Sequence, residues 1–241
     1  MMLAQKIGRV LLVLEQAVRD HAPVTFANSL GAEDMVLTDL IAKHFSQSHQ
    51  GEISMFSLDT GRLPHETYDL MLELRNRYGI PLQLYFPNDA LVEEYVARHG
   101  ENGIYDSVEN RKRCCQIRKV EPLRRALAGK RAWITGMRRE QAVTRSSLEV
   151  SAYDADHGLH KFNPLLDWTS AEVWEYIKQF DVPYNALHDR FYPSIGCAPC
   201  TRAIAVGEDI RAGRWWWEDP EHKECGLHLG KTVPIRQSRS A

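Results

Sequence analysis

The first twenty residues have the spacing of a surface helix. Apolar side chains recur three and four positions apart, at Ile7, Val10, Leu11, Leu14 and Val18, with charged residues between them. This periodicity predicts an amphipathic helix. Charges interrupt the apolar run at helical spacing, so the pattern does not fit a secretory signal peptide.

After this helix, short apolar runs alternate with segments of helical period. The pattern predicts strands at 23–29, 52–59, 81–87 and 131–136, and helices at 31–45, 65–79, 89–100, 115–129 and 169–181. Pro122 is expected in the first turn of the fourth of these helices or at a kink in it. Segments 148–154 and 159–166 are predicted to be extended. Strands that alternate with helices predict an α/β fold, with a mostly parallel sheet and helices on both faces.

The periodic pattern stops near residue 183. Pro, Gly and Cys residues and a Trp triplet at 215–217 follow without regular spacing, and the chain closes on a polar stretch that we expect to be mobile. The simplest division is an α/β domain over residues 1–182 and an irregular C-terminal segment over residues 183–241, together forming a single domain.

Composition narrows the class of protein. The chain has 241 residues, of which 44% are hydrophobic and 26% charged, with a formal net charge of -2. A charge this close to zero argues against a protein that mainly coats nucleic acid. No stretch approaches the roughly 18 apolar residues of a membrane span. We therefore expect a cytoplasmic globular protein, in which five cysteines indicate metal binding or catalysis more than disulfides.

Three polar loops follow predicted strands. In the first, Gly31 would let the backbone approach a ligand, and the helix that begins there would offer N–H groups to a phosphate. An ordinary turn between a strand and a helix is the alternative. Residues 58–61 and 135–140 also lie at strand ends. Because ligands gather at the carboxyl ends of parallel strands, the three loops together predict a nucleotide-binding crevice.

Four of the five cysteines form two close pairs. Cys114 and Cys115 are adjacent, which suits a disulfide badly, and Cys197 and Cys200 form a C-x-x-C. Together they indicate a zinc site or an iron–sulfur cluster, and an adjacent pair fits the usual zinc spacing poorly. A redox C-x-x-C pair and buried structural thiols are alternatives. Five basic residues flank the first pair and are expected to offset the negative charge of a cluster: Arg111, Lys112, Arg113, Arg118 and Lys119.

The fifth cysteine, Cys225, stands apart from the others, between His222 and His228. A neighbouring imidazole could raise its thiolate fraction, which makes it either a reactive thiol or a cysteine without a role. Upstream, Arg211 and Arg214 are spaced to clamp an anion. The Trp triplet that follows fits either a stacking surface for nucleic acid or simple packing of the segment.

Seven motifs, in this order, resemble the adenylyl-sulfate and phosphoadenylyl-sulfate reductase family. They are SLGAED, LDTGRLPHETY, CCQIRKVEPL, TGMRREQ, FNPLLDW, GCAPCTR and ECGLH, and the resemblance covers residues 24–229. The two cysteine pairs further resemble the branch that carries a 4Fe-4S cluster and prefers adenylyl sulfate (APS). Relatives without these four cysteines typically use the 3'-phosphorylated substrate (PAPS).

The resemblance implies a Rossmann-like fold with a modified PP-loop at residues 29–34. It implies substrate contacts at Ser29, Gly31, Leu58, Lys119, Gly136, Arg138, Arg211 and Arg214. It implies one 4Fe-4S cluster per subunit, held by Cys114, Cys115, Cys197 and Cys200, with Cys225 as the nucleophile. Homo-oligomers are common in the family.

The reaction expected from the resemblance is reduction of APS to sulfite and AMP, through a thiosulfonate on Cys225, in sulfate assimilation and cysteine biosynthesis. If four thiols hold a cluster, Cys225 has no resolving partner in the chain. An external dithiol, thioredoxin or a glutaredoxin-like protein, must then release the sulfite. The alternatives are the same reaction on PAPS, an ATP-using adenylating enzyme, a cluster-bearing redox sensor or regulator, and a zinc-stabilised binding module.

Overall fold

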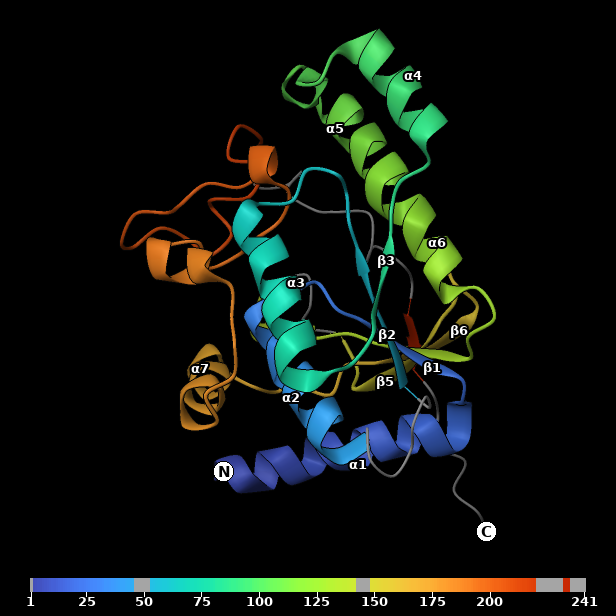
Figure 1. Cartoon of the computed structure of the whole chain (residues 1–241), viewed down its shortest axis with the longest axis vertical. Helices are drawn as coiled ribbons and strands as arrows, with labels where there is room; N and C mark the ends of the chain where they lie inside the picture. Colours follow the sequence, from blue (N-terminus) through green and yellow to red (C-terminus); the bar gives the residue numbers. More distant parts are fainter. Residues whose placement is uncertain (1, 46–52, 142–147, 220–231, 235–241) are drawn as a thin grey trace.

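The computed structural model of the chain describes residues 2–45, 53–141, 148–219 and 232–234. A seven-stranded sheet lies at its centre, in the order β3-β2-β1-β4-β6-β5-β7 (Figure 1). Five neighbouring strands, β3, β2, β1, β4 and β6, are parallel to one another. Strand β5 runs antiparallel to both of its neighbours, β6 and β7. The strands are β1 (Val24–Ala27), β2 (Ile53–Leu58), β3 (Leu82–Tyr85), β4 (Ala132–Ile134), β5 (Ser151–Asp154), β6 (Leu159–Phe162) and β7 (Thr232–Pro234).

Helices connect the parallel strands, and each predicted helix is present. They are α1 (Leu3–His21), α2 (Ala32–Phe45), α3 (His65–Tyr78), α4 (Asp89–His99), α5 (Val108–Cys115), α6 (Glu121–Leu127) and α7 (Ser170–Gln179). The predicted helix 115–129 started too late, since α5 begins at Val108. The Ser107 hydroxyl caps α5 by accepting a hydrogen bond from Asn110 N.

Both faces of the sheet are covered, as the sequence predicted. Because side chains alternate along a strand, Phe26 and Met55 pack in the larger core with α1, α2, α3 and α7. Phe56 and Trp133 point to the opposite face and pack against α6. The mostly parallel α/β fold is therefore confirmed.

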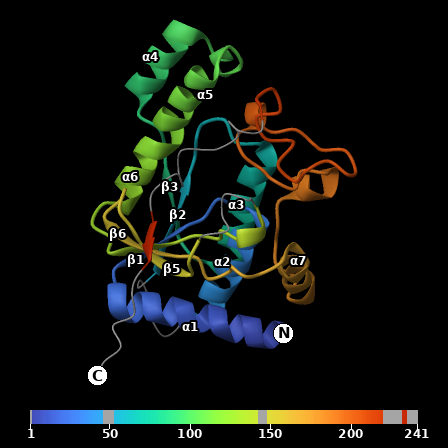
Figure 2. The same cartoon turned by 180° about the vertical axis from the view of Figure 1, so that it is seen from behind.

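Helices α5 and α6 lie in line and form one continuous rod (Figures 1 and 2). A five-residue π-helix, Gln116–Val120, joins them. Its position follows from Pro122, which has no N–H to donate to the carbonyl four residues earlier. The π-helix lets the rod continue without that bond, and it carries Lys119, four residues after Cys115.

The segment after residue 183 is irregular over the part described, residues 183–219, as predicted. It contains short 3-10 helices at Ala186–Arg190 and Ala198–Cys200 and an antiparallel bridge between Thr201 and Arg214. The expectation of an irregular end was wrong for Thr232–Pro234, which forms β7. This strand pairs with β5, whose backbone would otherwise present an unpaired sheet edge. Among the described helices, none has the length and apolar character needed to cross a membrane.

Candidate active site

A cavity of about 640 Å³ opens at the carboxyl ends of the central strands. Strands β1 and β4 are neighbours at the centre of the sheet. From β1 the sheet continues through β2 and β3 in one direction, and from β4 it continues through β6 in the opposite direction. Such a reversal of strand order leaves a crevice between the two connecting loops. The loops after β1, β2 and β4, which the sequence singled out, all line this cavity, and the C-terminal segment forms its other wall.

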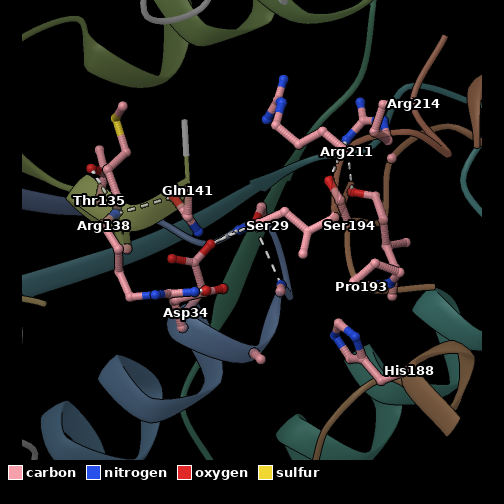
Figure 3. A pocket seen from close by; sticks show the side chains of 18 of the residues that line it. Ser29, Asp34, Thr135, Arg138, Gln141, His188, Pro193, Ser194, Arg211 and Arg214 are labelled. Atoms are coloured by element: carbon pink, nitrogen blue, oxygen red, sulfur yellow. Dashed lines mark hydrogen bonds and ion pairs between the residues drawn. The ribbon is translucent and has the colours of Figure 1, made fainter. Parts of the chain in front are cut away.

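All eight residues predicted to contact substrate line the cavity: Ser29, Gly31, Leu58, Lys119, Gly136, Arg138, Arg211 and Arg214. Figure 3 shows Ser29, Asp34 and Arg138 along one side. Arg211 and Arg214 lie across the cavity from them. The fold thus brings together residues separated by more than half of the chain.

The loop between β1 and α2 differs from the expected phosphate cradle. Ser29 donates to the Asp34 carboxylate through its backbone N (2.7 Å) and its hydroxyl (2.5 Å). Leu30 N donates to Asn28 Oδ1 at 2.8 Å, and Gly31 N makes a longer contact of 3.4 Å with the Ser29 hydroxyl. The N–H groups of these three residues are therefore occupied by the chain's own side chains.

Asp34 closes this loop against β4. Its side chain is buried, and that burial raises the pKa of the carboxyl to about 7, although hydrogen bonds from Ser29 and Gly136 N act in the opposite direction. A Cβ atom on Gly136 would overlap the Asp34 carboxylate. Glycine at position 136 is thus needed for β4 and α2 to approach each other at the cavity wall.

Arg138 lines the cavity but already has two acidic partners. Its guanidinium is 2.8 Å from the carboxylates of Glu33 and Glu140, and it also donates to Trp168 O at 3.1 Å. Only 4% of the residue is exposed. Two carboxylates offset its charge, so its position suits fixing the loop of residues 136–141 more than attracting an anion.

The opposite wall carries the cations that suit an anion. Arg214 donates to Ile195 O at 3.3 Å and to the Ser194 hydroxyl at 3.4 Å, and its backbone N donates to Arg211 O at 2.9 Å. A Cβ on Gly196 would lie 2.6 Å from the Arg214 guanidinium carbon, so the glycine allows this close approach. Planar guanidinium groups of this kind bind phosphate and sulfate oxygens well.

A second, smaller pocket lies beside the cavity and is lined by all four paired cysteines. The fold brings Cys114 and Cys115, at the end of α5, next to Cys197 and Cys200. None of the four forms a disulfide. Within the described residues, no three His, Cys, Asp or Glu side chains are grouped as the ligands of a metal ion are. The thiols therefore surround a pocket instead of meeting at one point.

Burial favours the protonated form of two of these thiols, Cys114 and Cys200. It raises the pKa of Cys200 to about 12, and it also raises the pKa of Cys114, against the effect of the Arg118 guanidinium. Buried thiolates need cations, and binding of metal ions would displace their protons. The cationic residues that line the pocket are Arg62, Arg111, Arg118 and Lys119.

Two of the predicted charge-offsetting residues are placed elsewhere. Lys112 and Arg113 are exposed on α5 and do not line the pocket, so their charge-offsetting role stays a prediction. Arg62 takes their place, from the loop after β2. No spacing pattern pointed to Arg62, because it is far from both cysteine pairs along the chain.

The polar groups around the thiols test whether the pocket fits an iron–sulfur cluster. The Thr60 hydroxyl lies 3.2 Å from Cys197 Sγ. The buried indole N–H of Trp215, which packs with Cys114, Cys197 and Cys200, has no hydrogen-bond partner within the described chain. A buried donor without an acceptor is costly, and sulfur ligands or sulfide would supply one. Four thiols, one hydroxyl and this N–H fit a thiolate-bound cluster.

The Trp triplet is resolved in favour of packing. Trp215 is 1% exposed, and Trp217 packs its ring edge-on against Tyr105 at 4.4 Å between ring centroids. Trp216, the most exposed of the three, packs edge-on against Trp217 at 4.8 Å. Trp215 therefore packs against α5, Trp216 and Trp217 pack around Tyr105 in the turn before that helix, and no stacking surface for nucleic acid is needed to explain the three rings.

Lys119 lines both the cavity and the cysteine pocket, so the two are neighbours. Cys225 lies outside the described residues. The cavity also contains residues that the sequence did not suggest, among them His188, Pro193 and Ser194. They come from loops without a recognisable spacing, and only the folded chain places them together (Figure 3).

Comparison with known proteins shows the family of the chain. The sequence profile of the phosphoadenosine phosphosulfate reductase domain matches residues 23–203. The chain is 53% identical over 226 residues to an adenosine 5'-phosphosulfate reductase of Allochromatium vinosum, covering 94% of this chain and 86% of the relative. It is 53% identical over 239 residues to the protein of that name from Burkholderia cepacia, covering 99% and 94%.

Solved structures are similar at the level of the fold. A phosphoadenylyl-sulfate (PAPS) reductase from Candida auris, in a phosphate complex, superimposes with a TM-score of 0.67 at 30% identity, covering 81% of this chain and 90% of that one. An FMN adenylyltransferase from Candida glabrata superimposes with a TM-score of 0.59 at 16% identity, covering 97% and 78%, which is a likeness of fold alone. By its sequence profile and its closely similar relatives, the chain belongs to the phosphoadenosine phosphosulfate reductase family.

Proposed function

We propose that this protein reduces adenosine 5'-phosphosulfate to sulfite and AMP, in the cytoplasm, as a step of sulfate assimilation toward cysteine. Relatives about half identical over nearly the whole chain carry the name of this activity. The observation that carries the proposal is the position of Lys119, which joins a nucleotide-sized cavity with a basic wall to a pocket of four thiols.

The cavity offers different surroundings to the two ends of such a substrate. The strand-end loops, with Leu58 and Gly136, form a partly apolar wall that suits adenosine. Arg211 and Arg214 lie across the cavity from Arg138, Lys119 also lines the cavity, and these three cations suit the phosphosulfate. Because the β1–α2 loop uses its own N–H groups internally, the substrate's anionic end belongs with these three cations.

The chemistry is assigned to Cys225. Its thiolate attacks the sulfur of the sulfate group, forming an S–S bond as the bond from sulfur to the phosphate oxygen breaks. The electron pair of that bond leaves with AMP, and the enzyme holds a thiosulfonate. An anion must approach a sulfur surrounded by anionic oxygens, so fixed positive groups lower the repulsion and stabilise the charge in transfer.

Release of sulfite needs a second thiol. A thiolate of thioredoxin, or of a similar dithiol protein, attacks Cys225 Sγ and expels sulfite with the electron pair. The second thiol of the donor then resolves the mixed disulfide, returning Cys225 to its reduced form. The donor supplies both electrons, which balances the two-electron reduction of the sulfate sulfur.

The four paired cysteines are proposed to hold one 4Fe-4S cluster per subunit. When bound, the cluster would cross-link the helical rod to the C-terminal segment and place its charge near Lys119. The chain contributes the remaining parts: the Thr60 hydroxyl lies beside Cys197, the Trp215 ring packs with three of the cysteines, and Arg62, Arg111 and Arg118 offset negative charge. We also propose a homo-oligomer, as is common among relatives.

The proposal is tested by sulfite release from APS with thioredoxin as donor, measured together with iron and sulfide content. The Cys225→Ser variant should retain iron, sulfide and AMP binding and release no sulfite. Sulfite release at the normal rate by this variant would refute the assignment. A higher kcat/KM for PAPS than for APS would overturn the choice of substrate while leaving the chemistry in place.

A further inference from the structure

Trp215 lies within reach of two arginines that belong to different sites. Its ring centroid is 4.7 Å from the guanidinium carbon of Arg214, which lines the cavity. The same ring is 4.8 Å from the guanidinium carbon of Arg111, which lines the cysteine pocket. Cations at these distances from an indole are attracted to it, so this buried ring links the two sites.

The turn that carries Trp215 is held at several points. Arg214 N donates to Arg211 O and Glu218 N donates to Trp215 O, both at 2.9 Å, while Trp215 N donates to Cys200 O at 3.1 Å. Trp215 also has a φ of 43°, in the left-handed region that residues with a side chain avoid. Such a conformation persists only where surrounding contacts enforce it.

A buried ion pair closes the far end of this turn. Glu218 accepts two hydrogen bonds from Arg111, at 2.8 Å from Nε and 2.6 Å from Nη2. Their side chains are 3% and 1% exposed. Arg111 lies on α5, the helix that ends in Cys114 and Cys115. The pair therefore ties the turn of residues 211–218 to the helix that supplies two of the four thiols.

We propose that Arg111 and Glu218 are positioning residues that set the affinity of the cavity for the anionic part of its substrate. They act through the turn of residues 211–218, which presents Arg211 and Arg214 to the cavity. This inference rests on the proposed function in one respect, that the substrate's phosphosulfate lies against these two arginines.

The physical reason is that neither partner of the pair can be removed without a change nearby. Loss of the Glu218 charge removes the carboxylate partner of the buried Arg111 guanidinium, and breaking a buried ion pair on one side drives local rearrangement. The strained Trp215 backbone is then free to relax toward a more common conformation. Arg214 immediately precedes Trp215, and its guanidinium packs on the Trp215 ring. When the Trp215 backbone relaxes, the Arg214 guanidinium therefore moves away from the place where it would meet an anion.

The test compares two ligands that differ in one phosphate. Glu218→Gln should weaken AMP binding roughly two- to thirtyfold, as changes in a coupled network typically do, and leave adenosine binding unchanged. Glu121→Gln is the matched control, since it removes an exposed Glu–Arg pair on α6 that lines neither pocket, and it should change neither affinity. Isothermal titration calorimetry of the iron-loaded proteins measures both ligands.

A second variant keeps the test decisive. Arg111→Lys retains the charge but loses the two-pronged geometry, and should weaken AMP in the same direction by a smaller factor. If Glu218→Gln does not retain iron, the AMP affinity of Arg111→Lys decides whether the inference holds. Equal AMP affinity in the variants and the wild type, or an equal loss for AMP and adenosine, overturns the inference.

The outcome is separable from that of the proposed function. A wild-type protein that releases no sulfite from APS refutes the function. A wild type that does release it, beside a Glu218→Gln variant with normal KM for APS, refutes only the positioning role. The inference predicts that Glu218→Gln raises KM for APS by a larger factor than it lowers kcat. The reason is that substrate, once bound, meets the same nucleophile as in the wild type.

Discussion

Replacing Gly196 by alanine should displace the Arg214 guanidinium while leaving the fold intact. A Cβ at this position would lie 2.6 Å from the guanidinium carbon and 3.0 Å from Nη1 of Arg214. The overlapping atoms form the far end of a flexible side chain, so the arginine can move without a shift of the backbone. Gly196 does not have a positive φ, and alanine therefore adds no backbone strain.

The size of the effect follows from what Arg214 would contribute to an anion. A hydrogen bond to a charged group is worth about 1.5–3 kcal/mol, which corresponds to roughly a ten- to hundredfold change in Kd. We expect AMP to bind Gly196→Ala more weakly by that factor, and adenosine to bind with the wild-type Kd. The midpoint of thermal unfolding should stay close to that of the wild type.

Calorimetric titration with AMP and adenosine measures the two affinities, and iron content confirms that the neighbouring Cys197 still serves its pocket. Gly8→Ala is the matched control, because a Cβ on Gly8 meets no atom within 4 Å. Wild-type AMP affinity in Gly196→Ala would refute the assignment of Arg214 to the anion. A loss of adenosine affinity of the same size would show that the whole cavity had changed.

Three further changes test other parts of the structure. Gly8→Ala, within α1, should raise the free energy of unfolding by about 1 kcal/mol, because alanine loses less backbone entropy than glycine; no increase in a urea titration would contradict this. Thr169→Ala removes the capping box of α7 and should lower the free energy of unfolding by about 1 kcal/mol, and a wild-type urea midpoint would argue against the cap. Burial raises the pKa of Asp34 to about 7, so the folded state binds more protons than the unfolded state between about pH 4 and 7, and stability falls as pH rises through that range. Asp34→Asn has no such charge to bury, so its free energy of unfolding, relative to that of the wild type, should rise from pH 5 to pH 7. A difference in free energy of unfolding that does not depend on pH would mean that the pKa of the Asp34 carboxyl is not raised.

Much of the fold follows directly from the sequence pattern. The alternation of apolar runs and helical periods predicts the strands, the helices and the two covered faces, because side chains such as Phe26 and Phe56 must point in opposite directions along paired strands. The strand β7 was missed, since three residues in a polar stretch have no periodicity and their pairing depends on the open edge of β5. The early start of α5 was also missed, because the run of residues 108–115 has few apolar positions.

The site was predicted as a set of residues, and its internal contacts were not. Sequence motifs brought out the cavity residues and the four paired cysteines, which the fold places in two adjoining pockets. Nothing in the sequence indicated that Asp34 would occupy the Ser29 N–H group, or that Arg138 would be held by Glu33 and Glu140. Such contacts depend on side-chain directions across the cavity, which linear spacing does not encode.

A single-turnover experiment tests the proposed chemistry most directly. The reduced protein is mixed with APS in the absence of any dithiol, AMP is quantified, and the protein is analysed by peptide mass spectrometry. We predict one AMP released per chain and one sulfonate group on the peptide that contains Cys225, removed on addition of reduced thioredoxin with release of sulfite. AMP release without a protein-bound sulfonate, or a sulfonate on any cysteine other than Cys225, would contradict the proposed mechanism.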